Sequence, residues 1–127
     1  MSGYTLKNLM ETKDMAAEQG FGDAMSARFP YGELGCEQLG FSLQELKPDV
    51  EAPFGHTHNE AEEVYVVLAG SGRVRLDDEV EELEPLDALR VAPDVLRAFA
   101  AGPDGLRFLV FSARHEGDAN MEPEPWS

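Results

Sequence analysis

Apolar and polar residues follow two different patterns along this chain, and the pattern changes near residue 37. Between positions 6 and 10 the apolar residues have the spacing of one helical turn, and residues 11–19 favour a helix that glycines then end. Residues 24–29 favour a strand. We therefore expect residues 1–30 to form an N-terminal arm that contains a short helix or turn.

From residue 37 onward the pattern is that of short strands separated by turns. Residues 39–45 alternate between apolar and polar positions, and residues 63–68 form an apolar, β-branched run typical of a strand buried on both faces. Further strands are predicted at residues 53–58, 73–76, 80–83, 85–91, 96–100 and 106–112, with turns at 47–49, 70–72, 77–78, 92–94 and 102–105. About eight short strands without long intervening helices indicate an all-β sandwich or barrel.

After residue 112 the chain becomes polar and contains Pro123 and Pro125, which indicates irregular structure. Trp126 is a large apolar residue in this tail, and it either docks on the side of the barrel or caps a dimer interface or the barrel mouth. The pattern divides the chain into an arm (residues 1–30), a β-barrel domain (residues 31–115) and an irregular C-terminal tail (residues 116–127).

The amino-acid composition limits the kinds of partner and compartment that we expect for this protein. The 127 residues suffice for one domain, and an apolar fraction of 43% suffices for a core. The net charge of -15 repels phosphate backbones and anionic membranes, so neither nucleic acid nor a membrane is expected as a partner. Residues 64–69, the longest apolar run, are too few to span a bilayer, and the N-terminus lacks a secretory signal. With one cysteine and no disulfide, we expect a cytoplasmic protein.

Two histidines and a carboxylate are the candidate metal ligands. His56 and His58 are two positions apart, which on a strand places both imidazoles on one face about 6–7 Å apart at the backbone. Glu63 opens the following strand, and a hairpin can bring its carboxylate to the same point. Two nitrogens and one oxygen suit a divalent metal such as Zn, Mn, Fe, Ni or Cu. Taken alone, however, two histidines at this spacing can also be exposed and without function.

The whole string resembles the first motif of the cupin superfamily, which is His-x-His, three or four residues, Glu, six residues and Gly. His56, His58, Glu63 and Gly70 match this form in identity and spacing, although the glycine that opens the family motif is absent. Glu62 would point to the opposite face of its strand. The resemblance covers roughly residues 39–111. It implies a small single-domain cupin with a double-stranded β-helix, the jelly-roll barrel, and it suggests a homodimer.

The second cupin motif departs from the family form. It contains a proline, a turn glycine and a histidine that supplies the fourth ligand, but here Asp94 replaces the glycine and Arg97 the histidine. A guanidinium cannot bind a metal. Three arrangements are open: Arg97 binds a substrate anion beside a three-ligand metal, it pairs with Glu63 in place of the metal, or it turns outward to solvent.

Other residues are candidates for the wall of the pocket. Tyr65 and Phe99 share the inward faces of Glu63 and Arg97 by the two-residue period of strands, and they form either barrel core or ligand pocket. Gln44 is a further candidate for binding substrate. His115 follows the last strand in a polar stretch and is expected to be solvated rather than a ligand.

Two functional hypotheses follow, and the sequence leaves open whether the protein is an enzyme. In the first, His56, His58 and Glu63 hold a divalent metal ion, and the protein acts on a small anionic metabolite that Arg97 orients, with Tyr65 as a proton donor. In the second, the protein is a non-catalytic, metal-free cupin that binds a small molecule over an Arg97–Glu63 floor. No catalytic residue is assigned.

Overall fold

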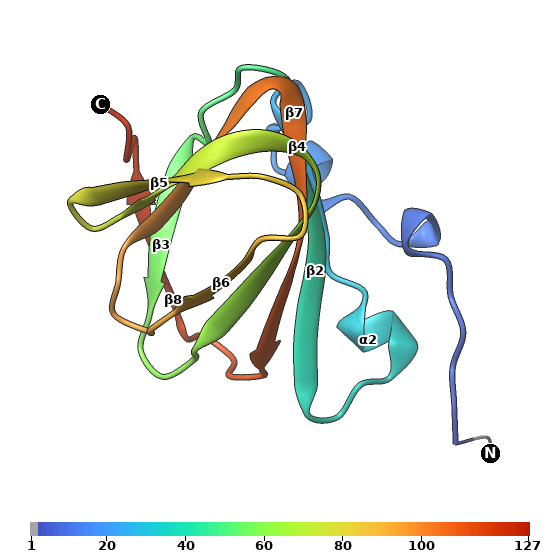
Figure 1. The fold of residues 1–127 in the computed structure, drawn as a ribbon. Coiled ribbons are helices and arrows are strands. Elements are labelled where there is room, and N and C mark those ends of the chain that lie inside the picture. Colours follow the sequence, from blue (N-terminus) through green and yellow to red (C-terminus); the bar gives the residue numbers. More distant parts are fainter. Residues whose placement is uncertain (1–2) are drawn as a thin grey trace.

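The computed structural model describes residues 3–127 and shows a curled sheet that closes into a small barrel (Figure 1). Its strands are β1 (Met25–Arg28), β2 (Leu39–Leu46), β3 (Phe54–His58), β4 (Glu63–Leu76), β5 (Glu79–Leu83), β6 (Ala88–Val91), β7 (Arg97–Ala113) and β8 (Ala119–Pro123). Short helical segments are η1 (Leu9–Glu11), α1 (Met15–Glu18) and α2 (Tyr31–Leu34). The predicted all-β barrel, preceded by a segment with short helices, is confirmed.

The longest strands, β4 and β7, form the centre of the barrel. They pair antiparallel from Val64↔Phe111 to Leu76↔Arg97, with register shifts between residues 67 and 69 and between 70 and 72. The turns predicted at 70–72 and 102–105 are therefore wrong, because both strands bend there and continue. A Cβ at Gly70 would lie 2.0 Å from the carbonyl oxygen of Gly105. Only glycine therefore allows β4 and β7 to approach this closely at residue 70.

Strand β3 carries both candidate histidines, His56 and His58. Strand β3 pairs along its whole length with β8, from Phe54↔Pro123 to His58↔Ala119, and meets β7 at His56↔Arg97. The prediction of an irregular tail is thus wrong for residues 119–123. These residues are all exposed, so no alternation of apolar and polar positions marked the strand.

Trp126 docks on the side of the barrel. Its indole Nε1 donates a hydrogen bond of 3.2 Å to the carbonyl of Phe99, and the guanidinium of Arg73 lies 4.8 Å from its ring centroid. This is the first of the alternatives considered for Trp126, and it ties the end of the chain to β7 and β4.

The arm is joined to the barrel through β1, which pairs with β2 from Met25↔Leu46 to Arg28↔Leu43. The strand predicted at residues 24–29 is confirmed. Asp14 precedes α1 and connects the helix to this strand, because its Oδ1 accepts hydrogen bonds from the backbone N–H groups of Ala16, Ala17 and Ala27. Although partial burial opposes it, these bonds and Arg28 lower the pKa of Asp14.

We predict that Asp14→Ala lowers the free energy of unfolding by about 1–2 kcal/mol, because the substitution leaves three backbone donors without their acceptor. Asp14→Asn, which keeps an acceptor oxygen, should cost less. Urea denaturation of the three proteins measures the difference. Equal stability of Asp14→Ala and the parent would show that the cap does not fasten the arm.

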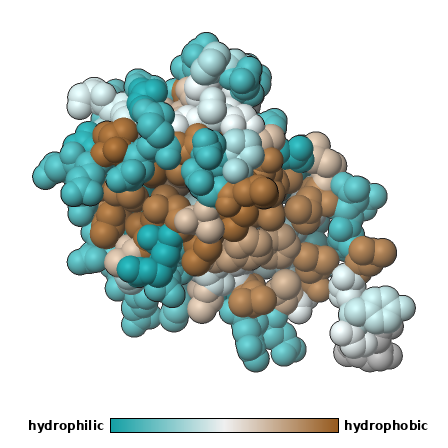
Figure 2. All heavy atoms as spheres, viewed as in Figure 1, coloured by the Kyte–Doolittle hydropathy of each residue, from teal (hydrophilic) through white to brown (hydrophobic). Residues whose placement is uncertain are grey.

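The surface mixes strongly hydrophilic residues with exposed apolar ones. Figure 2 shows apolar residues gathered across the middle of the face seen in Figure 1, with hydrophilic residues around them. Exposed large apolar residues include Leu39, Val80, Leu86 and Met121. An apolar surface of this kind is compatible with the predicted homodimer, which stays a prediction. Among the described residues, no helix is long and apolar enough to cross a membrane.

Candidate metal centre

Strand geometry brings the three predicted ligands together. His56 and His58 alternate with Thr57 on β3 and so share its inward face, while Glu63 begins β4. The ligating atoms of His56, His58 and Glu63 all lie within 4.8 Å of one another. The two imidazole rings stand almost perpendicular, with centroids 4.9 Å apart. The neighbouring Glu62, which was predicted to point away from the site, is exposed and pairs with Arg90.

Glu63 is the buried centre of the polar network. Its Oε1 accepts hydrogen bonds from the Tyr65 hydroxyl at 2.5 Å and from Nη1 of Arg97 at 2.8 Å, and Nε2 of His56 lies 3.2 Å from it. Burial alone would raise the pKa of this carboxyl group, but His56, Tyr65 and Arg97 together outweigh it and lower the pKa to about 2. Glu63 is therefore a carboxylate at neutral pH and can act as an anionic ligand.

Tyr65 is held in its protonated form. Complete burial and the adjacent Glu63 carboxylate raise the pKa of the hydroxyl well above its ordinary value. Since the hydroxyl donates to Glu63, it orients the carboxylate and does not serve as a base. The ring packs against Phe99 and Phe108 at centroid distances of 4.7 and 5.8 Å.

Arg97 makes the contact with Glu63 that the second of the three arrangements predicts, while the replacement of a metal by this pair stays a prediction. Its side chain is fully buried, and Nη1 pairs with Glu63. Nε donates to the carbonyl of Val95, and Nη2 donates to the carbonyls of Ala92, Pro93 and Val95 at 2.6–3.1 Å. Because the guanidinium is committed to these acceptors and has no exposed surface, the predicted binding of a substrate anion by Arg97 is not supported.

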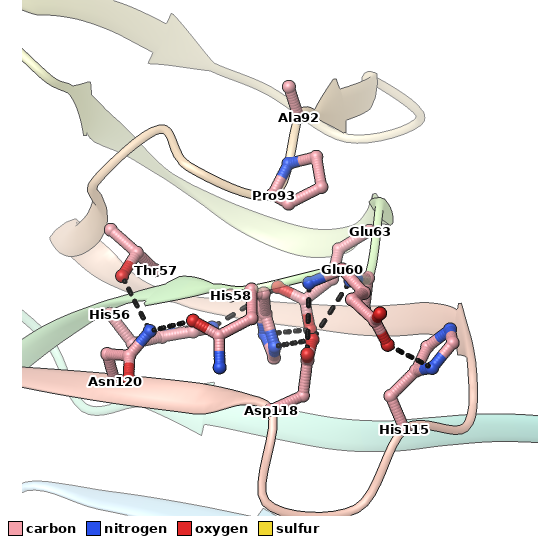
Figure 3. A network of polar contacts seen from close by, with 12 residues as sticks. His56, Thr57, His58, Glu60, Glu63, Ala92, Pro93, His115, Asp118 and Asn120 are labelled. Atoms are coloured by element: carbon pink, nitrogen blue, oxygen red, sulfur yellow. Dashed lines mark hydrogen bonds and ion pairs between the residues drawn. The ribbon is translucent and has the colours of Figure 1, made fainter.

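His58 is fixed from behind by Asp118. Nδ1 of His58 lies 3.2 Å from Oδ2 of Asp118, whose carboxylate also accepts from the backbone N–H groups of Glu60 and Ala61 at 2.9 Å (Figure 3). Despite some desolvation, these backbone donors and His58 lower the pKa of Asp118. An ionised Asp118 accepts a hydrogen bond from Nδ1–H of His58, so Nε2 of the neutral imidazole presents its lone pair to the site.

That lone pair accepts no hydrogen bond from the part of the chain that the structure describes. Nε2 of His58 is buried and has no hydrogen-bond partner within the described chain. It lies 3.2 Å from Oε2 of Glu63, which is within reach of an ion pair, but the contact lacks the geometry of a hydrogen bond. Two electron-rich atoms facing each other at this distance need a cation between them, which is either a proton or a metal ion.

The spacing of the donors fits a metal ion. Two ligands that bind zinc at about 2.0–2.1 Å in tetrahedral geometry lie about 3.3–3.4 Å apart. Nε2 of His56 lies 3.2 Å from Oε1 of Glu63 and Nε2 of His58 lies 3.2 Å from Oε2, while all three ligating atoms lie within 4.8 Å of one another. A neutral imidazole, a second imidazole and a carboxylate are also the donor types that divalent transition metals take. His56, His58 and Glu63 therefore fit a divalent metal ion.

Asp118 was missed by sequence reasoning. It lies in the stretch predicted to be irregular, 60 positions after His58, and no spacing rule links an acid to a histidine at that separation. Only the pairing of β3 with β8 brings Asp118 beneath the imidazole. Asp118 differs from its polar neighbours in being buried. Burial is seen only in the structure, so the sequence held no signal that could have identified Asp118.

We predict that Asp118→Asn weakens metal binding by about 10–100-fold, because the amide still accepts from the backbone but no longer holds the proton of His58 on Nδ1. Zinc titration against a chelating indicator measures the affinity. Glu122→Gln removes an exposed charge from β8 and is the matched control, with no expected change. Equal affinities for both variants would mean that Asp118 does not orient the ligand.

A cavity of about 720 Å³ adjoins the triad. The predicted wall residues Tyr65, Phe99 and Gln44 all line it, together with Arg97. Gln44 donates a hydrogen bond of 3.0 Å to the Ser42 hydroxyl. A smaller hollow of about 270 Å³ opens beside it and shares His58 and Glu63. The size of the larger cavity is that of typical small-molecule sites.

His115 lies outside the triad, as predicted. It is partly exposed and its Nδ1 lies 3.3 Å from a carboxylate oxygen of Glu60 at the surface (Figure 3). Of the three histidines in the sequence, two thus belong to the candidate site and one to the surface.

Comparison with known proteins agrees with the geometry. Residues 42–112 match the family model described as the cupin domain. No curated protein matches the sequence. Among solved structures, a cupin protein from Bacteroides fragilis superposes with a TM-score of 0.73 at 25% identity, covering 92% of this chain and 89% of that chain.

Two further solved structures share the fold. The polyketide cyclase RemF from Streptomyces resistomycificus superposes with a TM-score of 0.76 at 22% identity, covering 97% of this chain and 87% of that one. Oxalate decarboxylase from B. subtilis superposes with a TM-score of 0.73 at 22% identity, covering 93% of this chain but 33% of that longer chain. These two proteins carry different names for their reactions, so the shared fold does not select a reaction.

Proposed function

This chain belongs to the cupin family, and from that premise we propose that it binds one divalent metal ion through His56, His58 and Glu63 and uses it on a small molecule held in the adjoining cavity. The observation that carries the proposal is the buried Nε2 of His58, which has no hydrogen-bond partner in residues 3–127 and lies 3.2 Å from Glu63. Three protein ligands leave a coordination position for substrate or water, as in catalytic sites.

The chain's own residues prepare this site. Asp118 holds the tautomer of His58, while Tyr65 and Arg97 donate to one oxygen of Glu63 and leave Oε2 facing His58. When bound, a divalent ion would polarise a substrate oxygen or activate water. The apolar walls of the cavity would exclude bulk water from that oxygen.

A second candidate function rests on Arg97. Its buried pair with Glu63 at 2.8 Å neutralises the carboxylate without any ion, which supports a metal-free cupin that only binds a small molecule. The lone pair of His58 favours the first candidate, since the Arg97 pair engages Oε1 of Glu63 and does nothing for Nε2 of His58.

Elemental analysis of protein purified without a histidine tag tests the first proposal. We expect close to one divalent ion per chain in the parent protein and in His115→Ala, because His115 lies outside the triad. His56→Ala should lose the ion, since two ligands hold a metal far less tightly than three. Parent protein that stays free of metal after incubation with zinc, manganese, iron, nickel or copper would favour the metal-free candidate instead.

A further inference from the structure

We propose that the cavity beside the triad selects an apolar ring compound that carries oxygen at one end only, and rejects hydrophilic metabolites such as sugar acids. The inference rests on the proposed function for the oxygen, which would face the metal ligands. The apolar character of the rest of the ligand is inferred from the residues that line the cavity.

One wall is a cluster of three aromatic rings. Phe99 and Phe108 stack with centroids 4.7 Å apart and planes 24° from parallel, and Tyr65 packs against both. All three side chains line the cavity, and Tyr65 connects the cluster to Glu63 through its hydroxyl. The flat apolar surface therefore begins directly beside the candidate metal ligands, where a planar ring can pack against it.

A second apolar part of the lining includes residues of the N-terminal arm. Phe21, which precedes β1, meets Phe54 of β3 edge to face at a centroid distance of 5.4 Å, and both line the cavity. Phe29 at the end of β1 lines it as well. The lining thus combines aromatic side chains of the arm and of the barrel with the three residues of the triad.

Few polar groups inside the cavity could satisfy a hydroxylated ligand. Apart from the triad and its partners, the described polar lining residues that are not exposed are Tyr31, Ser42 and Gln44, and the last two hydrogen-bond to each other. A sugar ring would leave most of its hydroxyls without partners, which is costly in a desolvated site.

Among residues 3–127, no free cation faces the cavity to hold a phosphate or a second carboxylate. Of the described residues that line it, the cationic ones are Lys13 and Arg97. Lys13 is exposed and pairs with Glu18 at 2.7 Å, and Arg97 is committed to Glu63 and to backbone carbonyls. A charged group is therefore accepted only at the metal end.

Two probes with the same head group test the inference. We expect 2-naphthoate, a carboxylate on an apolar ring system, to bind the zinc-loaded protein at least about tenfold more tightly than glucuronate, a carboxylate on a hydroxylated ring. Isothermal titration calorimetry measures both dissociation constants. Glucuronate binding as tightly as 2-naphthoate, or no binding of 2-naphthoate at all, would overturn the inference.

A pair of matched variants places the probe in the cavity. Phe29 lines it and is 43% exposed, while Phe111 lies on β7 outside the lining and is 39% exposed. Phe29→Ser should weaken 2-naphthoate binding by about fivefold or more, and Phe111→Ser should leave it unchanged. Equal effects of the two substitutions would place the probe elsewhere and overturn the inference.

The same titrations separate this inference from the proposed function. If the protein binds stoichiometric zinc but shows no preference for 2-naphthoate, the metal site is supported and the proposed class of apolar ring compounds is refuted. If the protein takes up no zinc but still prefers 2-naphthoate, the selection of apolar rings by the cavity is supported and the metal-dependent function is refuted.

Discussion

Zinc added to metal-free protein is expected to raise the free energy of unfolding by about 2.7–4.1 kcal/mol when free zinc is 100–1,000 times the dissociation constant. The reason is that the folded chain holds the ligating atoms of His56, His58 and Glu63 within 4.8 Å of one another, whereas the unfolded chain does not. Chemical denaturation with zinc and with a chelator measures the difference.

A matched set of histidine variants shows where the zinc acts. The double variant His56→Ala/His58→Ala should show no stabilisation by zinc, because only Glu63 of the triad remains. His115→Ala should respond as the parent does, since its imidazole contacts a surface carboxylate. An equal response in all three proteins would mean that zinc binds outside the barrel.

Arg97→Met is expected to lower the free energy of unfolding by about 3–5 kcal/mol in the metal-free protein. The guanidinium is fully buried, and its removal leaves the Glu63 carboxylate without its cation. The backbone carbonyls of residues 92, 93 and 95 would also lose the hydrogen bonds that the guanidinium donates. Urea denaturation in the presence of a chelator measures the cost.

Arg90→Met is the control for loss of an arginine. Arg90 pairs with Glu62 at 3.2 Å, but both side chains are more than half exposed, so the expected cost is about 0–1 kcal/mol. The double variant Arg97→Met/Glu63→Gln should recover part of the lost stability, because it also removes the buried carboxylate charge that Arg97→Met leaves unpaired. A cost for Arg97→Met no greater than that for Arg90→Met would refute the structural role given to the pair.

The candidate ligands could be predicted because their geometry is local. A two-residue spacing places His56 and His58 on one face of any strand, and Glu63 opens the next strand. Most strand positions were also predictable from alternation and turn residues, and β1 and β2 lie where the pattern placed them. These features depend on neighbours in the sequence and on the pleat of a strand.

The remaining features depend on contacts between distant segments. Asp118 reaches His58 only through the pairing of β8 with β3, and β8 itself has no apolar alternation. The direction of Arg97 is fixed by Glu63 and by carbonyls of the preceding turn, so the sequence left three arrangements open. The glycines at 70 and 72 were interpreted as a turn, although they allow β4 to pass close to β7.

Anomalous diffraction from crystals grown with zinc, recorded on both sides of the zinc absorption edge, tests the central claim most directly. We predict a single strong anomalous peak bonded to Nε2 of His56, Nε2 of His58 and a carboxylate oxygen of Glu63, with Asp118 still on Nδ1 of His58. A peak at His115 or elsewhere on the surface, with none among these three side chains, would contradict the metal-binding account.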